Sequence, residues 1–233
     1  MKSIIGALVL AVAIPGLLAA QERPAAEVAR DAARKPAEMV AFAGVKPGQT
    51  VADMIPGGGY FTRVFSLAVG PNGKVIAIIP AAAEAAYPEP SKAIRAMGAN
   101  GWQNVSVVAS PLDPAVLGKL DMFWTAQNYH DLHNSQTPEQ VIGFNKAVFA
   151  ALKPGGVYVV VDHAAADGTG LTATKTLHRI DPAAIKAEVT AAGFTFDGES
   201  AALRNPEDPK TANVFDPTIR GKTDQIVYRF KKP

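Results

Sequence analysis

The sequence predicts an α/β fold with a doubly wound, mostly parallel sheet. Short apolar runs, which suit strands buried on both faces, alternate along the chain with segments of helical periodicity. Three consecutive glycines, Gly57 to Gly59, follow the first of these runs and precede a helical segment. The last two apolar runs have no helix between them, which predicts an antiparallel pair at one edge of the sheet.

The composition is that of one globular domain. The chain has 233 residues, of which 48% are hydrophobic and 19% are charged, so a disordered chain is excluded. The net charge of +2 gives no indication of a nucleic-acid partner. There is no cysteine, which excludes disulfides, thiolate metal sites and a cysteine nucleophile.

The N-terminus has the pattern of a secretory signal peptide. A short positive start is followed by an apolar run from Ile4 to Leu18, which is too short to favour a membrane span. Small residues then precede Gln21 and suit cleavage. The sequence therefore predicts a signal peptide over residues 1–20 and a single mature domain over 21–233. We expect a periplasmic protein that is not inserted in the membrane after cleavage.

The first half of the mature chain supplies three expected strands. They are 51–53, 75–79 and 105–109, each bounded by turn residues. A modest helical face over 37–43 ends at Gly44, and apolar residues from Phe61 onward have helical spacing. Pro88 and Pro90 are expected to break the next segment, so that Ser91 begins a short helix.

The second half continues the alternation. Further strands are expected at 122–124, 157–161, 194–198 and 225–230. Thr137 predicts a helix start with a capping box, because Pro138 follows it and Gln140 lies three residues later. Asp181 and Pro182 begin the last expected helix. The segment 201–224 is long for a connection, and loops of that length are usually functional or disordered.

From about Arg30 to its end the chain resembles the class I S-adenosylmethionine-dependent methyltransferases. The resemblance depends on Asp53 with Gly57 and Gly59, and on the sequence from Leu152 to Val157. The sequences 176–181 and 220–224 are similar to a group of exported bacterial proteins described as predicted methyltransferases. This resemblance implies a Rossmann-like sheet of seven strands in which the last strand is antiparallel.

The resemblance also implies a cofactor, S-adenosylmethionine, and the residues that hold it. The residues expected to bind it are Asp53, Pro56, Gly57, Gly58, Gly59, Asp113 and Asn128, with the glycines on its amino-acid part and Asp113 on its adenine. Two positions depart from the family pattern. Ile55 stands where the family has a glycine, and Ile79 stands where it has the carboxylate that binds the ribose. These departures favour the alternative of a methyltransferase-fold protein that binds another small ligand or a metal.

The chain has four histidines, of which at least three are expected at the ligand-bearing edge of the sheet: His130, His133, His163 and His178. Three interpretations remain open: polar loop residues, general acid–base catalysis, and a metal site in which His-x-x-His binds together with carboxylates.

For methyl transfer to a small molecule or envelope component, we expect His130 to be the base. Asp131 or Asp162 would orient its ring, and Tyr129 would line the pocket. No residue is assigned as a metal ligand from the sequence, and the oligomeric state is left open.

Overall fold

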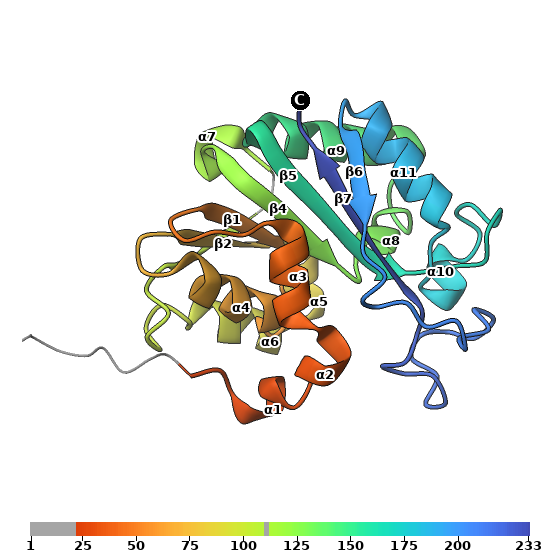
Figure 1. Ribbon diagram of the computed structural model, residues 1–233, viewed down its shortest axis with the longest axis horizontal. Coiled ribbons are helices and arrows are strands. Elements are labelled where there is room, and N and C mark those ends of the chain that lie inside the picture. The colour runs from red at the N-terminus through yellow and green to blue at the C-terminus, as the bar shows by residue number, and fades with distance from the viewer. Residues whose placement is uncertain (1–21, 110–111) are drawn as a thin grey trace, which may run out of the picture.

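The computed structural model describes residues 22–109 and 112–233. The predicted signal peptide over 1–20 lies outside the described residues. The strands are β1 (Thr50–Met54), β2 (Lys74–Ile79), β3 (Val105–Ala109), β4 (Leu120–Ala126), β5 (Leu152–His163), β6 (Thr195–Glu199) and β7 (Gln225–Lys231). All seven join one sheet in the order β3-β2-β1-β4-β5-β7-β6 (Figure 1). The predicted fold class is confirmed.

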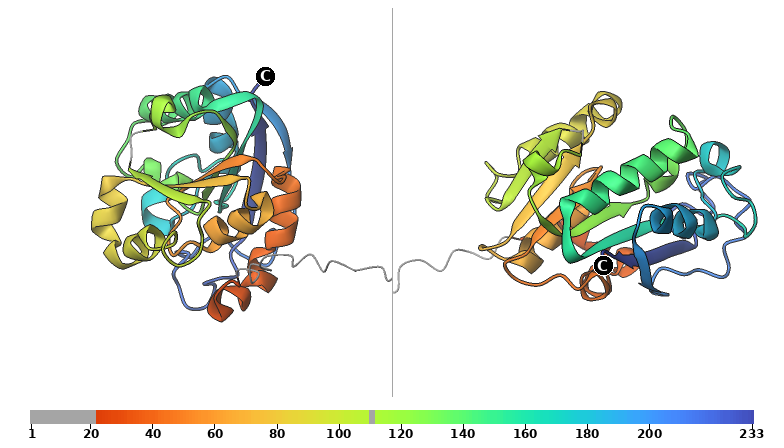
Figure 2. Two further views of the ribbon diagram at one scale, coloured as in Figure 1. Left: turned by 90° about the vertical axis from the view of Figure 1, so that its left-hand side faces the viewer. Right: turned by 90° about the horizontal axis from the view of Figure 1, so that it is seen from above.

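The helices connect the strands. They are α1 (Ala25–Val28), α2 (Asp31–Arg34), α3 (Pro36–Ala43), α4 (Tyr60–Val69), α5 (Ala81–Ala86), α6 (Pro88–Arg95), α7 (Pro114–Leu117), α8 (Tyr129–Leu132), α9 (Pro138–Ala151), α10 (Thr174–Leu177) and α11 (Pro182–Ala191). Seen from above, α9 and α11 lie on one side of the sheet and α3 on the other (Figure 2). No helix among these is long and apolar enough to cross a membrane.

A separate hydrophobic core lies on each face of the sheet. Side chains of a strand point alternately to opposite faces. Phe123 of β4 therefore packs in the core that α9 and α11 cover, whereas its neighbours Met122 and Trp124 pack in the core that α3 and α4 cover. Because both of their faces are buried, the central strands β2, β4 and β5 contain unbroken apolar runs.

The antiparallel pair expected at the end of the chain is present. β7 pairs antiparallel with β5 on one side and with β6 on the other, while the pairs among β1 to β5 are parallel. β6 is therefore the edge strand at this end of the sheet, and β7 is the strand that runs against its neighbours.

One of the predicted helix starts is confirmed and another was wrong. The capping box at Thr137 is confirmed, because Gln140 donates its backbone N–H to the Thr137 side chain and accepts from the Thr137 N–H. The prediction that Ser91 begins a helix was wrong. α6 begins at Pro88, and Ser91 lies inside it with its hydroxyl donated to the Tyr87 carbonyl. Proline is tolerated in a first helical turn, where N–H groups have no helical partner anyway.

Candidate functional site

A cavity of about 380 Å³ lies at the carboxyl ends of β1, β2 and β4. β1 and β4 are neighbours in the sheet, but the next strand in the chain after β1 is β2 on one side, whereas the next strand after β4 is β5 on the other side. Small molecules bind at such a reversal of strand order in open α/β sheets. Five of the residues that the sequence assigned to a cofactor line this cavity: Asp53, Pro56, Gly57, Gly58 and Asn128.

The other two predicted cofactor residues are not among the described residues that line the cavity. Gly59 is the N-cap of α4, where its φ is 90° and a Cβ would lie only 2.5 Å from Ile94 Cδ1, so both the backbone and the packing favour glycine. Asp113 is exposed, and its carboxylate accepts the backbone N–H of Ala115 at 2.8 Å. That contact belongs to the start of α7, so the structure gives no support to a role of Asp113 on an adenine.

Asp53 is the buried acid of the cavity. Its side chain is only 3% exposed, and Thr62 Oγ1 donates to its Oδ2 at 2.7 Å. Burial raises the pKa of this carboxyl to about 7, although the Thr62 hydrogen bond and the positive charge of Arg34 oppose the rise. Asp53 therefore takes up or releases a proton near neutral pH, beside the space where a ligand would bind.

In the turn after β1, an isoleucine has a backbone conformation that usually favours glycine. Ile55 has a φ of 52°, a left-handed conformation that is strained for a β-branched residue. Its backbone N–H donates to Ile78 O at 2.9 Å, and Asn128 Nδ2 donates to Met54 O at 3.1 Å. These hydrogen bonds stabilise the turn in this conformation. Ile79 is 3% exposed and puts an apolar wall on the cavity.

The N-terminal segment that contains α1 and α2 contributes basic residues that were not predicted from the sequence. Arg30 and Arg34 line the cavity, and Arg34 Nη2 donates to Gln127 Oε1 at 3.1 Å. Both guanidinium groups, together with that of Arg23, lie within 6 Å of the centre of the Tyr60 ring. The available signal was the spacing of the three arginines, seven and four residues apart, which is typical of one face of a helix, although the chain forms two short helices here.

Three of the four histidines gather beside this cavity. His130 lies in α8, directly after β4, and its ring centre lies 5.3 Å from that of His178 and 6.3 Å from that of His163. His130 Nδ1 is 2.8 Å from Asp162 Oδ1, and the His130 backbone N–H donates to Asp162 Oδ2 at 2.8 Å. His130 Nε2 lies 3.2 Å from His178 Nδ1 and 3.3 Å from Asp131 Oδ1. Asp162 is therefore placed to orient the ring, and Asp131 lies at its opposite nitrogen.

The charges around His130 change its expected role. Burial alone would lower the pKa of the imidazole, but the carboxylates of Asp162 and Asp131 outweigh burial and raise it to about 10. Conversely, burial would raise the pKa of Asp162, but the charge and hydrogen bonds of His130 lower it. A ring protonated at neutral pH has no free lone pair for a proton, which argues against His130 as a general base in this state.

Tyr129 and His133 point away from the cavity, which corrects the expectation that Tyr129 lines it. Tyr129 is fully buried, and its hydroxyl donates to Glu188 Oε2 at 2.9 Å and accepts from Asn145 Nδ2 at 2.8 Å. His133 Nε2 lies 3.2 Å from the same Glu188 oxygen. The one turn of α8 directs these side chains towards α9 and α11, so both belong to a buried polar network.

A second cavity, of about 410 Å³, shares Arg30, Arg34 and Gln127 with the first. Its wall also includes Arg220 and His163, whose Nδ1 lies 2.7 Å from Thr223 Oγ1. Burial lowers the pKa of His163 to about 4, so this ring is neutral at pH 7. The second cavity is therefore basic through its arginines alone.

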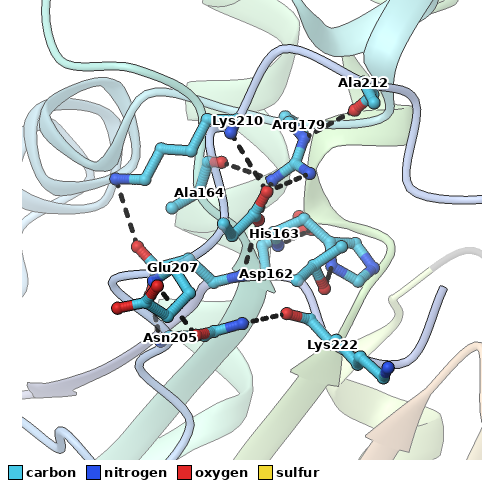
Figure 3. Close-up of polar contacts among 12 residues, drawn as sticks. Asp162, His163, Ala164, Arg179, Asn205, Glu207, Lys210, Ala212 and Lys222 are labelled. Carbon is cyan, nitrogen blue, oxygen red and sulfur yellow. Dashed lines mark hydrogen bonds and ion pairs between the residues drawn. The ribbon is translucent and has the colours of Figure 1, made fainter. Parts of the chain in front are cut away.

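The long segment over 201–224 is fixed by ion pairs. Arg179 is completely buried, and its guanidinium donates to Asp208 at 2.7 and 3.1 Å and to the carbonyls of Ala164 and Ala212 at 3.0 Å (Figure 3). Arg204 donates to Asp224 at 2.8 and 3.0 Å. These contacts fold the segment against the end of β5, and its Phe215 reaches the first cavity.

Comparison with solved structures identifies the fold. A SAM-dependent methyltransferase from Aquifex aeolicus superposes with a TM-score of 0.61 at 18% identity, over 88% of this chain and 93% of that one. The chain has the fold of the S-adenosylmethionine-dependent methyltransferases. Fibrillarin from Aeropyrum pernix, solved with natively bound S-adenosylmethionine, gives a TM-score of 0.53 at 14% identity, over 86% of this chain and 76% of that one.

The same fold occurs in a protein named for another reaction. The 4+2 cyclase SpnF has a TM-score of 0.59 and 14% identity, over 86% of this chain and 80% of that one. The sequence matches no protein-family model and no curated protein. At these identities the comparisons establish the methyltransferase fold, and the chemistry must be argued from the residues.

Proposed function

We propose that the protein is an enzyme that transfers a methyl group from S-adenosylmethionine to a small molecule or envelope component in the periplasm. The observation that carries the proposal is the cavity at the reversal of strand order, which is lined by the glycine turn, Asp53 and Asn128. Its volume of about 380 Å³ lies within the range of about 300–1,000 Å³ that is usual for small-ligand sites.

The residues of the cavity fit the amino-acid part of this cofactor. Gly57 and Gly58 carry no side chain, so a ligand can approach their backbone closely. Asp53 offers a buried carboxyl, and Arg30 and Arg34 offer positive charge for a carboxylate. Ile79 offers only an apolar surface, so the ribose hydroxyls would lack the carboxylate that the family pattern has.

When bound, S-adenosylmethionine supplies a methyl group that its sulfonium already activates. The protein then has to align the acceptor with that methyl. Asp131 lies on the cavity wall, and its carboxylate is the group placed to accept a proton from an acceptor. Asp162 and His130 hold the adjoining end of α8 in place. The second cavity, with Arg30, Arg34 and Arg220 in its wall, suits an acceptor that carries an anionic group.

Calorimetric titration of the purified protein with S-adenosylmethionine and with its demethylated product tests the proposal. We expect saturable binding of both. Gly58→Val should weaken it, because Gly58 lines the cavity while a Cβ there meets no atom within 4 Å. Gly143→Val is the matched control, since Gly143 has equal room but lies on the exposed side of α9. Absence of heat and of any thermal shift at millimolar ligand would contradict the proposal.

A second candidate function is favoured by one observation, the apolar wall at Ile79. The cavity would then bind a different small ligand, and the fold would serve another purpose. The variant Ile79→Asp discriminates between the two candidates. If the natural protein lacks affinity for S-adenosylmethionine and the variant gains it, the site has been adapted to another ligand.

A further inference from the structure

We propose that His130, His178 and Asp131 form a binding site for a divalent transition-metal ion at the edge of the first cavity. The three side chains come from two separate segments, α8 and the C-cap residue that follows α10. Their ligand atoms are His130 Nε2, His178 Nδ1 and Asp131 Oδ1, which together make two imidazoles and one carboxylate. This inference does not rest on the proposed methyl transfer, although Asp131 takes part in both.

The distances within the cluster suit coordination of a single ion. The three atoms form a nearly regular triangle, with sides of 3.2 Å between the two histidines, 3.3 Å from His130 to Asp131 and 3.6 Å from His178 to Asp131. Two ligand atoms that each lie about 2.1 Å from a tetrahedral ion are about 3.4 Å apart. One ion can therefore contact all three atoms without rearrangement of the backbone.

The surroundings of His130 fix which nitrogen is available. Asp162 is completely buried, and its Oδ1 lies 2.8 Å from His130 Nδ1. When a metal ion displaces the Nε2 proton of the ring, this contact keeps the remaining proton on Nδ1 and leaves the lone pair of Nε2 directed at the cluster. A carboxylate behind a histidine is the usual arrangement around metal-binding imidazoles, because it sets the tautomer and the ring orientation.

His178 is held towards the cluster by an unusual backbone. It ends α10 with a φ of 54°, a left-handed conformation in which histidine is enriched among residues other than glycine. Its ring also packs at 5.0 Å, edge to face, against Phe215 of the long segment. The ring is thus oriented by the segment 201–224 as well as by its own helix.

The site is accessible on one side. The side chain of His130 is 3% exposed, whereas those of His178 and Asp131 are 28% and 46% exposed. Asp131 and Phe215 also line the first cavity. Three protein ligands leave at least one coordination position free, the arrangement of catalytic rather than structural zinc sites. Water or an oxygen-bearing ligand from the cavity could fill that position.

The donor set selects the class of ion. Two imidazoles with one carboxylate suit zinc, cobalt or iron(II), whereas calcium and magnesium require oxygen ligands. Zn²⁺ is therefore the binding probe, and Co²⁺ is the spectroscopic one, because its visible absorption reports the number and type of ligands.

Metal titration of the purified, chelator-treated protein tests the inference in the absence of any S-adenosylmethionine. We expect one equivalent of Zn²⁺ to bind and raise the melting temperature, and Co²⁺ to give visible bands of a site with nitrogen and oxygen ligands. His178→Ala and Asp131→Asn should each weaken Zn²⁺ binding at least about tenfold, by analogy with losses at ligand-supporting positions. Both side chains are partly exposed, so these variants are expected to fold.

Asp113→Asn is the matched control for Asp131→Asn, since Asp113 is an exposed carboxylate outside the cluster. It should bind one equivalent like the natural protein. The inference is overturned if the natural protein binds no metal at one equivalent. It is also overturned if His178→Ala and Asp131→Asn leave the affinity and the Co²⁺ spectrum unchanged. Because no cofactor is added, failure here leaves the proposed methyl transfer untouched.

Discussion

Asp162 and His130 are joined twice, once through the side chain and once through the backbone. Asp162 Oδ1 lies 2.8 Å from His130 Nδ1, and Asp162 Oδ2 accepts the His130 N–H at 2.8 Å. The same Oδ1 also accepts the N–H of His163 at 2.7 Å. The carboxylate at the end of β5 thus fixes both the ring and the start of the turn that follows β4, which places Asp131 at the cavity.

Replacement of Asp162 by asparagine is expected to destabilise the protein. An amide cannot balance the charge of the buried His130 ring, and removal of one partner of a buried pair costs about 3–5 kcal/mol. The measurement is the free energy of unfolding in urea. Asp197→Asn is the control, because its pair with Arg229 at 2.8 Å is partly exposed and should contribute at most about 1 kcal/mol. Equal losses in the two variants would contradict the assignment of Asp162 as the buried anchor.

Asp53 should make stability depend on pH. Its pKa is raised from 3.8 to about 7, so between these values the folded protein holds a proton that the unfolded chain has released. Stability therefore falls as pH rises from about 4 to 7 and levels off above pH 7. The Asp53→Asn variant does not show this fall in stability, because asparagine does not ionise. Its stability relative to the natural protein should increase by roughly 2–3 kcal/mol between pH 5 and pH 8.

Urea unfolding of both proteins at pH 5 and pH 8 measures this difference. Comparison of the two proteins at each pH cancels the titration of all other groups. A difference that stays constant between the two pH values would mean that Asp53 ionises as an ordinary exposed carboxyl.

Among the three glycines of the turn after β1, Gly59 is expected to tolerate substitution by alanine least. Its φ is 90°, and a Cβ would lie 2.5 Å from Ile94 Cδ1 and 2.9 Å from Arg63 Nη1. We expect Gly59→Ala to cost about 1–3 kcal/mol of unfolding free energy from backbone strain and displacement of these side chains. Gly58→Ala, without positive φ and with open space around the Cβ, should change stability by less than about 0.5 kcal/mol. The opposite ranking in urea unfolding would contradict the described turn.

The sequence predicted the features that depend on local signals. Unbroken apolar runs identified the strands, and the capping box at Thr137 fixed a helix start to the residue. The resemblance to the methyltransferases implied that Asp53 and Asn128 lie at a ligand site, and both residues line the first cavity.

The details of the site depended on distance and direction, which the sequence does not contain. Tyr129 and His130 are neighbours, yet one points into the core and the other into the cluster, because a helix turns by about 100° at each residue. The pairing of His130 with His178 joins segments 48 residues apart. The left-handed conformation of Ile55 is contrary to its propensity and is imposed by the hydrogen bonds around it.

Arg179→Met is expected to release the long segment over 201–224. Arg179 and Asp208 are both fully buried and joined at 2.7 Å, so removal of the guanidinium leaves an unpaired buried carboxylate and costs about 3–5 kcal/mol. The carbonyls of Ala164 and Ala212 lose their donor as well. Limited proteolysis should then cut within 201–224 well before the rest of the chain, since a released segment exposes its backbone. The double variant Arg179→Met with Asp208→Leu should recover part of the unfolding free energy, because it removes the unpaired charge. Absence of both the faster cleavage and the partial recovery would mean that contacts other than this ion pair hold the segment against β5.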